Sequence, residues 1–287
     1  MRIGVLCLPT DEWPVWVERA RRLDELGFHH LWTFDHLSWR HYAGRPWHSA
    51  IPLLTATAAA TSRIRVGTLV ASPNFRHPVP FGHELMTADR ISAGRLILGI
   101  GGGGTGWDAT ALGQRPWPPP ERTARFTEFV STLDTLLTQP ETSLRGTYYS
   151  AENVRIVPGC VQQPRIPFAI AAVGPKALRL TAKHGDAWIT TGRGKTGDWR
   201  TDLADQWQIV EAECEKLGRD PAGIDKILVT SGIPGRVTAD IDEFDDFVVE
   251  LEAYGFTDVV FPYPRSDDDN YDDPPEIVEQ IAEHFLR

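Results

Sequence analysis

The chain has 287 residues, of which 41% are hydrophobic and 24% charged, and its formal net charge is −10. This composition is ordinary for a soluble globular protein, and the acidic balance argues against nucleic-acid binding. No apolar run approaches the length of a membrane span, and the short apolar start lacks the features of a secretory signal. Cys7, Cys160 and Cys214 form no CxxC pair, which favours a reducing, cytoplasmic location without a disulfide framework.

The charge is unevenly distributed along the chain. Residues 240–287 contain 16 acidic and 2 basic residues, whereas the preceding part is mildly basic. A run of this kind is typical of a solvated face or a mobile loop, and contact with a cationic partner is the alternative.

Strand-like and helix-like patterns alternate from the first residue onward. In the first half, short apolar and β-branched runs predict strands at residues 2–8, 30–34, 64–70 and 95–100. Apolar residues at helical spacing predict helices at residues 12–26, 51–60, 79–91 and 122–137.

The same alternation continues in the second half. It predicts strands at residues 166–172, 187–191, 226–230 and 258–262, and helices at residues 175–184, 199–217, 241–254 and 275–286. Eight strand–helix units favour a (β/α)8 TIM barrel in the α/β class, formed by a single domain over residues 1–287, with a doubly wound open sheet as the alternative. Residues 146–157 predict a small hairpin inserted between units four and five.

Active sites of such barrels lie where the strands end at their carboxyl side, so the strand exits carry the candidate residues. The second exit contains Asp35, His36 and Trp39. A histidine can exchange protons near neutral pH, and a carboxylate can fix its tautomer. His36, His41 and His48 share this loop, but their spacing matches no common metal-ligand pattern, so we expect no metal site.

A run of glycines follows the fourth strand. Residues 99–106 contain six glycines, among them Gly101, Gly102, Gly103 and Gly104. They match GxGxxG, but a dinucleotide-binding fingerprint requires a helix that starts directly on this loop, and Trp107, Pro116 and Pro118–Pro120 intervene here, which argues against it. The glycines indicate close approach of the backbone to a planar ring or a phosphate, with a flexible loop as the alternative.

Three further exits offer binding groups. The loop after the third strand, which begins near Leu69, Val70 and Ser72, is mildly basic and suits either a structured turn or a phosphate contact. The fifth exit (Ala172, Val173, Gly174) precedes a helix whose first amides favour an anion. The sixth exit offers the Thr191 hydroxyl and the Arg193 cation, which suit a polar or anionic substrate.

Taken together, these segments resemble the bacterial luciferase-like flavin oxidoreductase superfamily. The strongest parts are residues 27–32 with Asp35 and His36, then residues 63–68 and residues 94–101. Residues 171–188 add support. Within the superfamily, the Asp35–His36 pair is similar to that of members using the deazaflavin coenzyme F420.

The resemblance implies hydride transfer between F420 and a small organic substrate, with an FMN-dependent monooxygenase as the alternative. It implies that Asp35 contacts the cofactor ring, that His36 acts on the substrate, and that a non-proline cis peptide near Leu69–Val70 supports the ring. Residues 101–104 and 172–174 would hold the ring edge and the phosphate. Trp32, Trp39 and Trp107 would shape the substrate face, and a homodimer is expected.

The sequence also departs from the F420-dependent sugar-phosphate dehydrogenases of this group. They place a catalytic glutamate after the fourth-strand glycines, where this chain has Gly104, with Asp108 as the nearest acid. Trp39 also lies one residue closer to His36 than the corresponding tryptophan does. These differences concern the particular reaction and not the cofactor class. A non-catalytic barrel that binds a flavin or an anion, and a hydrolase using Asp35 and His36, are the alternatives of other classes.

Overall fold

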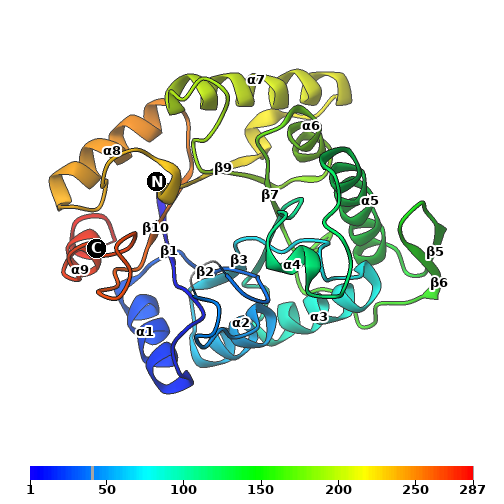
Figure 1. Ribbon diagram of the computed structural model, residues 1–287, viewed down its shortest axis with the longest axis horizontal. Helices are drawn as coiled ribbons and strands as arrows, with labels where there is room; N and C mark the ends of the chain where they lie inside the picture. Colours follow the sequence, from blue (N-terminus) through cyan, green and yellow to red (C-terminus); the bar gives the residue numbers. More distant parts are fainter. Residues whose placement is uncertain (40–41, 287) are drawn as a thin grey trace.

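Eight parallel strands close into a barrel in the computed structural model, which describes residues 1–39 and 42–286 (Figure 1). Their order around the barrel is β1-β10-β9-β8-β7-β4-β3-β2. The TIM-barrel prediction is therefore confirmed, and the open-sheet alternative is wrong. The barrel strands are β1 (Arg2–Leu6), β2 (His30–Thr33), β3 (Arg65–Thr68), β4 (Leu96–Ile100), β7 (Phe168–Ala171), β8 (Ala187–Thr190), β9 (Asp225–Val229) and β10 (Asp258–Pro262).

Helices surround the barrel as an outer ring, which buries the outward face of the strands (Figure 1). All eight predicted helices are present, with ends that differ by a few residues from expectation. None of the described helices is long and apolar enough to cross a bilayer. The eight are α1 (Trp13–Leu26), α2 (Ala50–Ala60), α3 (Pro78–Ile91), α5 (Pro119–Thr138), α6 (Pro175–His184), α7 (Trp199–Leu217), α8 (Ile241–Ala253) and α9 (Ile277–Phe285).

The predicted insertion is an antiparallel hairpin that projects outside α5 (Figure 1). Its strands are β5 (Thr142–Arg145) and β6 (Ser150–Val154), so residues 146–157 cover only the turn and the second strand. The first strand escaped the sequence analysis because it is short and only one of its four residues is buried. Glu128 on α5 fixes the turn, because its Oε1 accepts the backbone N–H groups of Tyr148 and Tyr149 at 2.8 and 2.7 Å.

Large side chains of β2 fill the barrel interior. His30 and Trp32 lie two positions apart, so both point to the inside of the barrel, and both are buried. Glycines on the neighbouring strands make room for them: a Cβ on Gly67 would lie 2.5 Å from the Trp32 ring, and one on Gly4 would lie 1.7 Å from His30 Nδ1. The glycines of β1 and β3 are therefore required by packing inside the barrel.

A four-residue helix, α4 (Trp107–Thr110), follows the glycine loop after β4. The sequence analysis did not predict it, because four residues carry no helical periodicity. The α4 helix lies near the centre of the view in Figure 1, inside the ring of outer helices. Asp108 on this helix is hydrogen-bonded to His36 in the loop after β2, so α4 lies at the carboxyl end of the barrel.

Candidate active site at the barrel mouth

A cavity of about 350 Å³ opens at the carboxyl ends of the barrel strands. Of the predicted site residues, Trp39, Leu69, Val70, Thr191 and Arg193 line it. Residues from the ends of six strands meet here, so the wall combines apolar, hydroxyl, amide and cationic groups. The complete lining is Phe34, Trp39, Leu69, Val70, Ala171, Ile189, Thr191, Arg193, Val229, Ser231, Asn270 and Tyr271.

One wall of the cavity is apolar and is formed by Leu69, Val70 and Ala171. The peptide bond between Leu69 and Val70 is cis, at the position that the family resemblance implied. The glycine loop packs against this wall, because a Cβ on Gly101 would lie 2.8 Å from Val70 Cγ2 and 3.5 Å from the Ala171 Cβ. Glycine at position 101 is thus required for the close approach of the two segments.

The rest of the glycine loop is fixed by Asn74, a buried residue that the sequence analysis missed. Gly103 has a φ of +71°, and a Cβ there would lie 2.7 Å from Asn74 Oδ1. The Asn74 amide donates to the Gly104 carbonyl at 3.3 Å. Gly102 packs near Phe126 and Gly104 is exposed, so the loop runs from the Val70 side of the cavity outward to the surface.

His36 is paired with Asp108 and not with its neighbour in sequence. Asp108 Oδ2 is hydrogen-bonded to His36 Nδ1, and Oδ1 accepts the Leu37 backbone N–H at 2.7 Å. The His36 ring stacks on Trp39 with 4.4 Å between centroids, and Trp47 Nε1 donates to the His36 carbonyl at 2.8 Å. His36 itself is not among the residues that line the cavity, but Trp39 is, so the imidazole lies beside the wall.

Asp35 lies in a separate ion pair. Arg76 donates to both of its carboxylate oxygens, from Nε at 2.9 Å and from Nη2 at 2.8 Å. Asp35 is 2% exposed, and the Arg76 guanidinium also lies over the Phe81 ring and contacts Glu84 at 3.2 Å. The adjacent residues Asp35 and His36 therefore interact with different residues, Arg76 and Asp108. Neither of these two pairings was predicted from the sequence.

The loop that carries Arg193 is held by hydrogen bonds to the first turns of α7. Asp202 accepts the backbone N–H groups of Lys195 and Thr196 at 2.9 and 3.0 Å, and these bonds hold the pKa of its carboxyl below the ordinary value. The Gln206 amide donates to the Arg193 carbonyl at 3.0 Å. The Arg193 guanidinium makes no ion pair with any residue that the structure describes, so it is an available cation on the cavity wall.

The remaining predicted residues lie around the cavity and not on its wall. Ser72 and Ala172 are buried, whereas Val173 and Gly174 are exposed at the start of α6. Trp107, on α4, is 60% exposed.

The acidic end of the chain takes part in the mouth. The loop after β10 supplies Asn270 and Tyr271 to the cavity wall, two residues that the sequence analysis missed. Asp268 in this loop accepts a hydrogen bond from Tyr42 Oη at 2.6 Å, and Asp267 pairs with Arg45 at 3.1 Å. Most acidic side chains of this loop remain exposed, as a solvated face would have them, but Asp268 is buried and Asn270 and Tyr271 contribute to the cavity wall.

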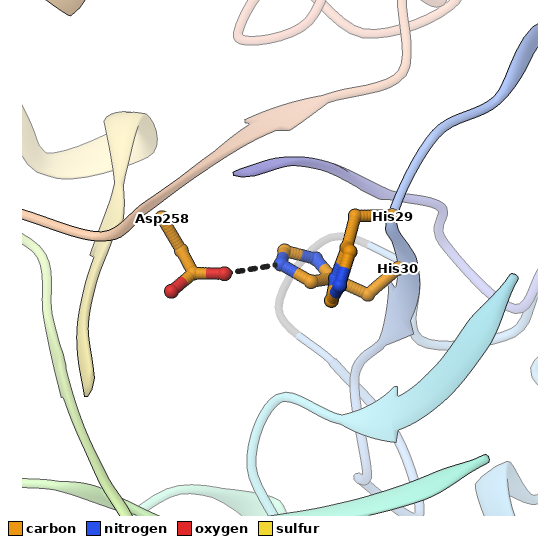
Figure 2. Close-up of side chains that lie close together, drawn as sticks. All are labelled: His29, His30 and Asp258. Atoms are coloured by element: carbon orange, nitrogen blue, oxygen red, sulfur yellow. Dashed lines mark hydrogen bonds and ion pairs between the residues drawn. The ribbon is translucent and has the colours of Figure 1, made fainter. Parts of the chain in front are cut away.

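A second histidine–aspartate pair lies at the opposite end of the barrel, because His30 is the first residue of β2 and Asp258 the first residue of β10. Figure 2 shows the two side chains joined by a hydrogen bond. Trp32 Nε1 donates to His30 Nδ1 at 2.6 Å, so His30 Nε2 carries the proton and donates to Asp258 Oδ1 at 2.9 Å. Arg2 donates to both Asp258 oxygens, at 2.8 and 2.6 Å. Trp32 is thus fully buried below the mouth, and the expectation that it shapes the substrate face is wrong.

Ionisation in this second cluster follows from burial and pairing. Burial, with His30 and Arg2 nearby, lowers the pKa of His29 to about 4. Burial alone would raise the pKa of Asp258, but hydrogen bonds from His30 and Arg2 hold it well below the ordinary range. The result is a neutral His29 beside a charged carboxylate.

The same cluster brings three potential metal ligands, His29, His30 and Asp258, within reach of one ion (Figure 2). Both nitrogens of His30 are already used in hydrogen bonds, and Arg2 adds positive charge next to the carboxylate. These contacts suit a hydrogen-bonded structural cluster better than a cation site. Among the histidines considered on the β2 loop, His41 lies outside the described residues.

Comparison with known proteins places this geometry in a family. The sequence profile described as luciferase-like monooxygenase matches residues 1–234. The F420-dependent glucose-6-phosphate dehydrogenase of Beutenbergia cavernae is 30% identical over 315 residues, covering 92% of this chain and 89% of the relative.

Solved structures agree on the fold. An F420-dependent secondary alcohol dehydrogenase, solved with an F420–acetone adduct, superposes with a TM-score of 0.83 at 16% identity, covering 99% of this chain and 98% of the other. The monooxygenase RslO1 of Streptomyces bottropensis gives a TM-score of 0.82 at 22% identity, covering 100% and 99%. With its closed barrel, its cavity at the strand ends and this sequence match, the chain belongs to the luciferase-like monooxygenase family, a family of oxidoreductases.

Proposed function

We propose that the protein is an F420-dependent oxidoreductase that transfers a hydride between the deazaflavin and a small organic substrate. The observation that carries the proposal is the cavity at the barrel mouth, with an apolar wall on one side and the His36–Trp39 stack beside it. A relative that uses F420 and is similar over nearly the whole chain supports this cofactor.

The described residues fit a planar cofactor with an anionic tail. Leu69, Val70 and Ala171 offer an apolar surface for the ring, and Gly101 packs against Val70 and Ala171. We assign Ser72 and the backbone of residues 101–104 to the edge of the ring. The first turn of α6, after residues 172–174, offers free backbone N–H groups for a phosphate. A Cβ on Gly174 would meet no other atom, so the space before this helix is open.

We assign the substrate side to residues on the other walls. Bound F420 supplies a carbon centre that accepts or donates a hydride. His36 gives or takes the accompanying proton, and Trp39 on the cavity wall keeps water from the reacting groups. Thr191 and Arg193 bind a polar or anionic group of the substrate, since both lie on the cavity wall and Arg193 is an available cation.

Asp35 has a narrower role than the resemblance alone implies. Both of its carboxylate oxygens are held by Arg76, so its contribution to the cofactor pocket comes as an Asp35–Arg76 pair. The pair is nearly buried, and we propose that it fixes the β2 exit on which His36 lies.

An FMN-dependent monooxygenase is the second candidate, because the RslO1 monooxygenase has the same fold over its whole length. The apolar wall would serve an FMN ring equally well. The two functions differ in their reaction with oxygen: the monooxygenase consumes oxygen with reduced flavin. A barrel that binds a flavin or an anion without turnover is the candidate of another class.

Fluorescence titration of the purified apoprotein with F420, and separately with FMN, tests the proposal. We expect micromolar or tighter binding of F420 and weaker binding of FMN. A preference for FMN would move the assignment to the monooxygenase, and binding of neither would contradict both. Binding of F420 without turnover of any oxidisable or reducible compound would favour the non-catalytic barrel.

We also propose that the protein is a cytoplasmic homodimer. The three cysteines are free and buried, in line with a reducing compartment. A surface groove between α2 and α3 is largely apolar and includes Leu37 and Ile91, each about half exposed. Light scattering on the wild type and on Ala56→Glu, in the middle of this groove, tests the dimer: the variant should be monomeric.

A further inference from the structure

We propose that Asp108 is the positioning residue of this site. Its carboxylate holds His36 in the tautomer that carries the proton on Nδ1, which leaves Nε2 to exchange a proton with the substrate. The inference rests on the proposed function, because it assigns a partner to the residue that transfers the proton there.

The direction of the hydrogen bond follows from the chemistry of its two ends. Asp108 Oδ2 meets His36 Nδ1, and Asp108 Oδ1 already accepts the Leu37 N–H at 2.7 Å. An ionised carboxylate can only accept, so Nδ1 must donate. A neutral imidazole with its proton on Nδ1 has its lone pair on Nε2.

The ring is held in this orientation from several sides. Its face lies on Trp39, tilted by 21°, and Trp47 fixes the backbone by donating to the His36 carbonyl. Asp108 is 7% exposed as a side chain, which keeps water from competing for its oxygens. Within the described part of the chain no hydrogen bond reaches Nε2, so this nitrogen is the one available for chemistry.

The acidic side chain at this site is Asp108, and residue 104 in the glycine loop is Gly104. Asp108, four residues further on, lies on α4 and faces the imidazole. If the substrate is an alcohol, its carbon loses a hydride to the cofactor and its hydroxyl proton passes to His36 Nε2, which leaves a carbonyl product. The imidazolium formed is stabilised by the Asp108 carboxylate and returns its proton to solvent.

Asp108→Asn separates the two bonds that Asp108 makes. The asparagine oxygen can still accept from Leu37, whereas its NH₂ group now donates to His36 Nδ1 and moves the ring proton to Nε2. Two-dimensional ¹⁵N NMR of the imidazole in alkaline buffer reads the tautomer directly, with His36→Asn to assign the signals. We expect Nδ1–H in the wild type and Nε2–H in D108N. Nε2–H in the wild type would overturn the proposal whatever the activity.

A double-mutant cycle with F420 and 2-propanol or glucose 6-phosphate as probes gives the functional readout. D108N should lower kcat by about 10- to 100-fold, with KM and the F420 dissociation constant changed less than about threefold, and Asp205→Asn on the outer face of α7 should match the wild type. In a His36→Ala background, D108N should cost less than about twofold. An equal loss in both backgrounds would overturn the proposal, because Asp108 would then act independently of His36.

The two proposals fail in different ways. Loss of F420 binding by the wild type contradicts the proposed function but leaves the tautomer measurement to decide the role of Asp108. If neither probe is turned over, the NMR result decides alone. Asp108→Ala, which loses the Leu37 bond as well, should show a lower melting temperature than D108N, and this difference separates anchoring of the loop from control of the ring.

Discussion

The barrel holds two histidine–aspartate pairs, one at each end, and they differ in almost everything except composition. His36 lies on the loop after β2 and Asp108 on the short helix α4, 72 positions apart, and the His36 side chain is 23% exposed. His30 and Asp258 begin two strands at the opposite end, and their side chains are 1% and 3% exposed. At the mouth one ring nitrogen is left without a described hydrogen bond, whereas at the other end both are used.

The comparison shows that the neighbours of a pair decide what it can do. His30 is locked by Trp32 on one side and by Asp258 on the other, and Arg2 neutralises the carboxylate. Because both ring nitrogens of His30 are hydrogen-bonded inside the protein, the ring cannot exchange a proton with a ligand. Loss of one partner would leave a buried polar group unpaired, so the intact pair matters for stability. Only Nδ1 of His36 is bonded to a carboxylate, that of Asp108, and the ring lies beside a cavity. Its other nitrogen, Nε2, is therefore available for proton transfer.

The largest expected effect is at the mouth. His36→Ala should lower turnover by roughly 10²–10⁴-fold, since general acid–base catalysis contributes about this much. Binding of F420, measured by fluorescence titration, should change little because the ring pocket lies on Leu69 and Val70. Unchanged turnover would show that the mouth pair does no chemistry and would remove the contrast between the two ends.

At the opposite end, Asp258→Ala should lower the free energy of unfolding by about 3 kcal/mol, because it leaves the His30 N–H buried without its acceptor. In thermal denaturation this corresponds to a melting temperature lower by roughly 6–12 °C. Asp225→Ala is the matched control: Asp225 pairs with the same Arg2 at 2.6 Å but is 45% exposed, so its loss should cost under about 1 kcal/mol. If both variants lose the same free energy of unfolding, the burial of Asp258 does not make its carboxylate more important for stability than that of Asp225.

Acid should weaken the fold through the same end of the barrel. His29 has a pKa of about 4 in the folded protein against 6.5 for an unperturbed histidine, so the unfolded chain binds more protons between these values. Stability is therefore complete above about pH 6.5 and falls as the pH drops toward 4, by less than about 1.4 kcal/mol per pH unit because His29 is only partly buried. Asp258, whose pKa is lowered, adds a further loss as the pH falls below its unfolded value of 3.8.

Urea unfolding across this range checks the linkage. His29→Gln, which cannot titrate, should flatten the dependence between about pH 6.5 and pH 4 and leave the steeper fall at lower pH. A variant as pH-sensitive as the wild type would assign the effect to another group.

The smallest effect concerns the cation on the cavity wall. Arg193→Gln should weaken binding of glucose 6-phosphate about tenfold, because a charged hydrogen bond is lost, and leave the KM for 2-propanol unchanged. Lys195→Gln on the same loop, which does not line the cavity, is the control. If both variants weaken binding equally, the charge of the loop and not a specific contact is responsible.

The barrel could be predicted from the sequence because its strands are continuous apolar runs between helices of clear periodicity. Elements without such patterns escaped, namely α4 and the half-exposed strand β5. Trp32 was assigned to the mouth from its position near the end of β2. Side chains alternate along a strand, however, and Trp32 shares the inward face with His30.

The site could be predicted only in part. Trp39, Leu69, Val70, Thr191 and Arg193 reach the cavity because every parallel strand ends at the same face. The pairings between residues on distant segments could not be predicted, because no local sequence pattern determines them. The path of the glycine loop brings Asp108 to His36, and the loop after β3 brings Arg76 to Asp35. Asn270 and Tyr271 could not be predicted, because the acidic composition of their segment indicated a solvated face, a mobile loop or a cationic partner and not a cavity wall.

A crystal structure of the protein with bound F420 tests the central claim most directly. We expect the deazaflavin ring in the mouth cavity, in contact with Leu69, Val70 and Ala171, with the His36–Asp108 pair intact beside it. A ring bound elsewhere, or a His36 that has left Asp108 when the cofactor is present, would contradict the assignment of the mouth pair to catalysis.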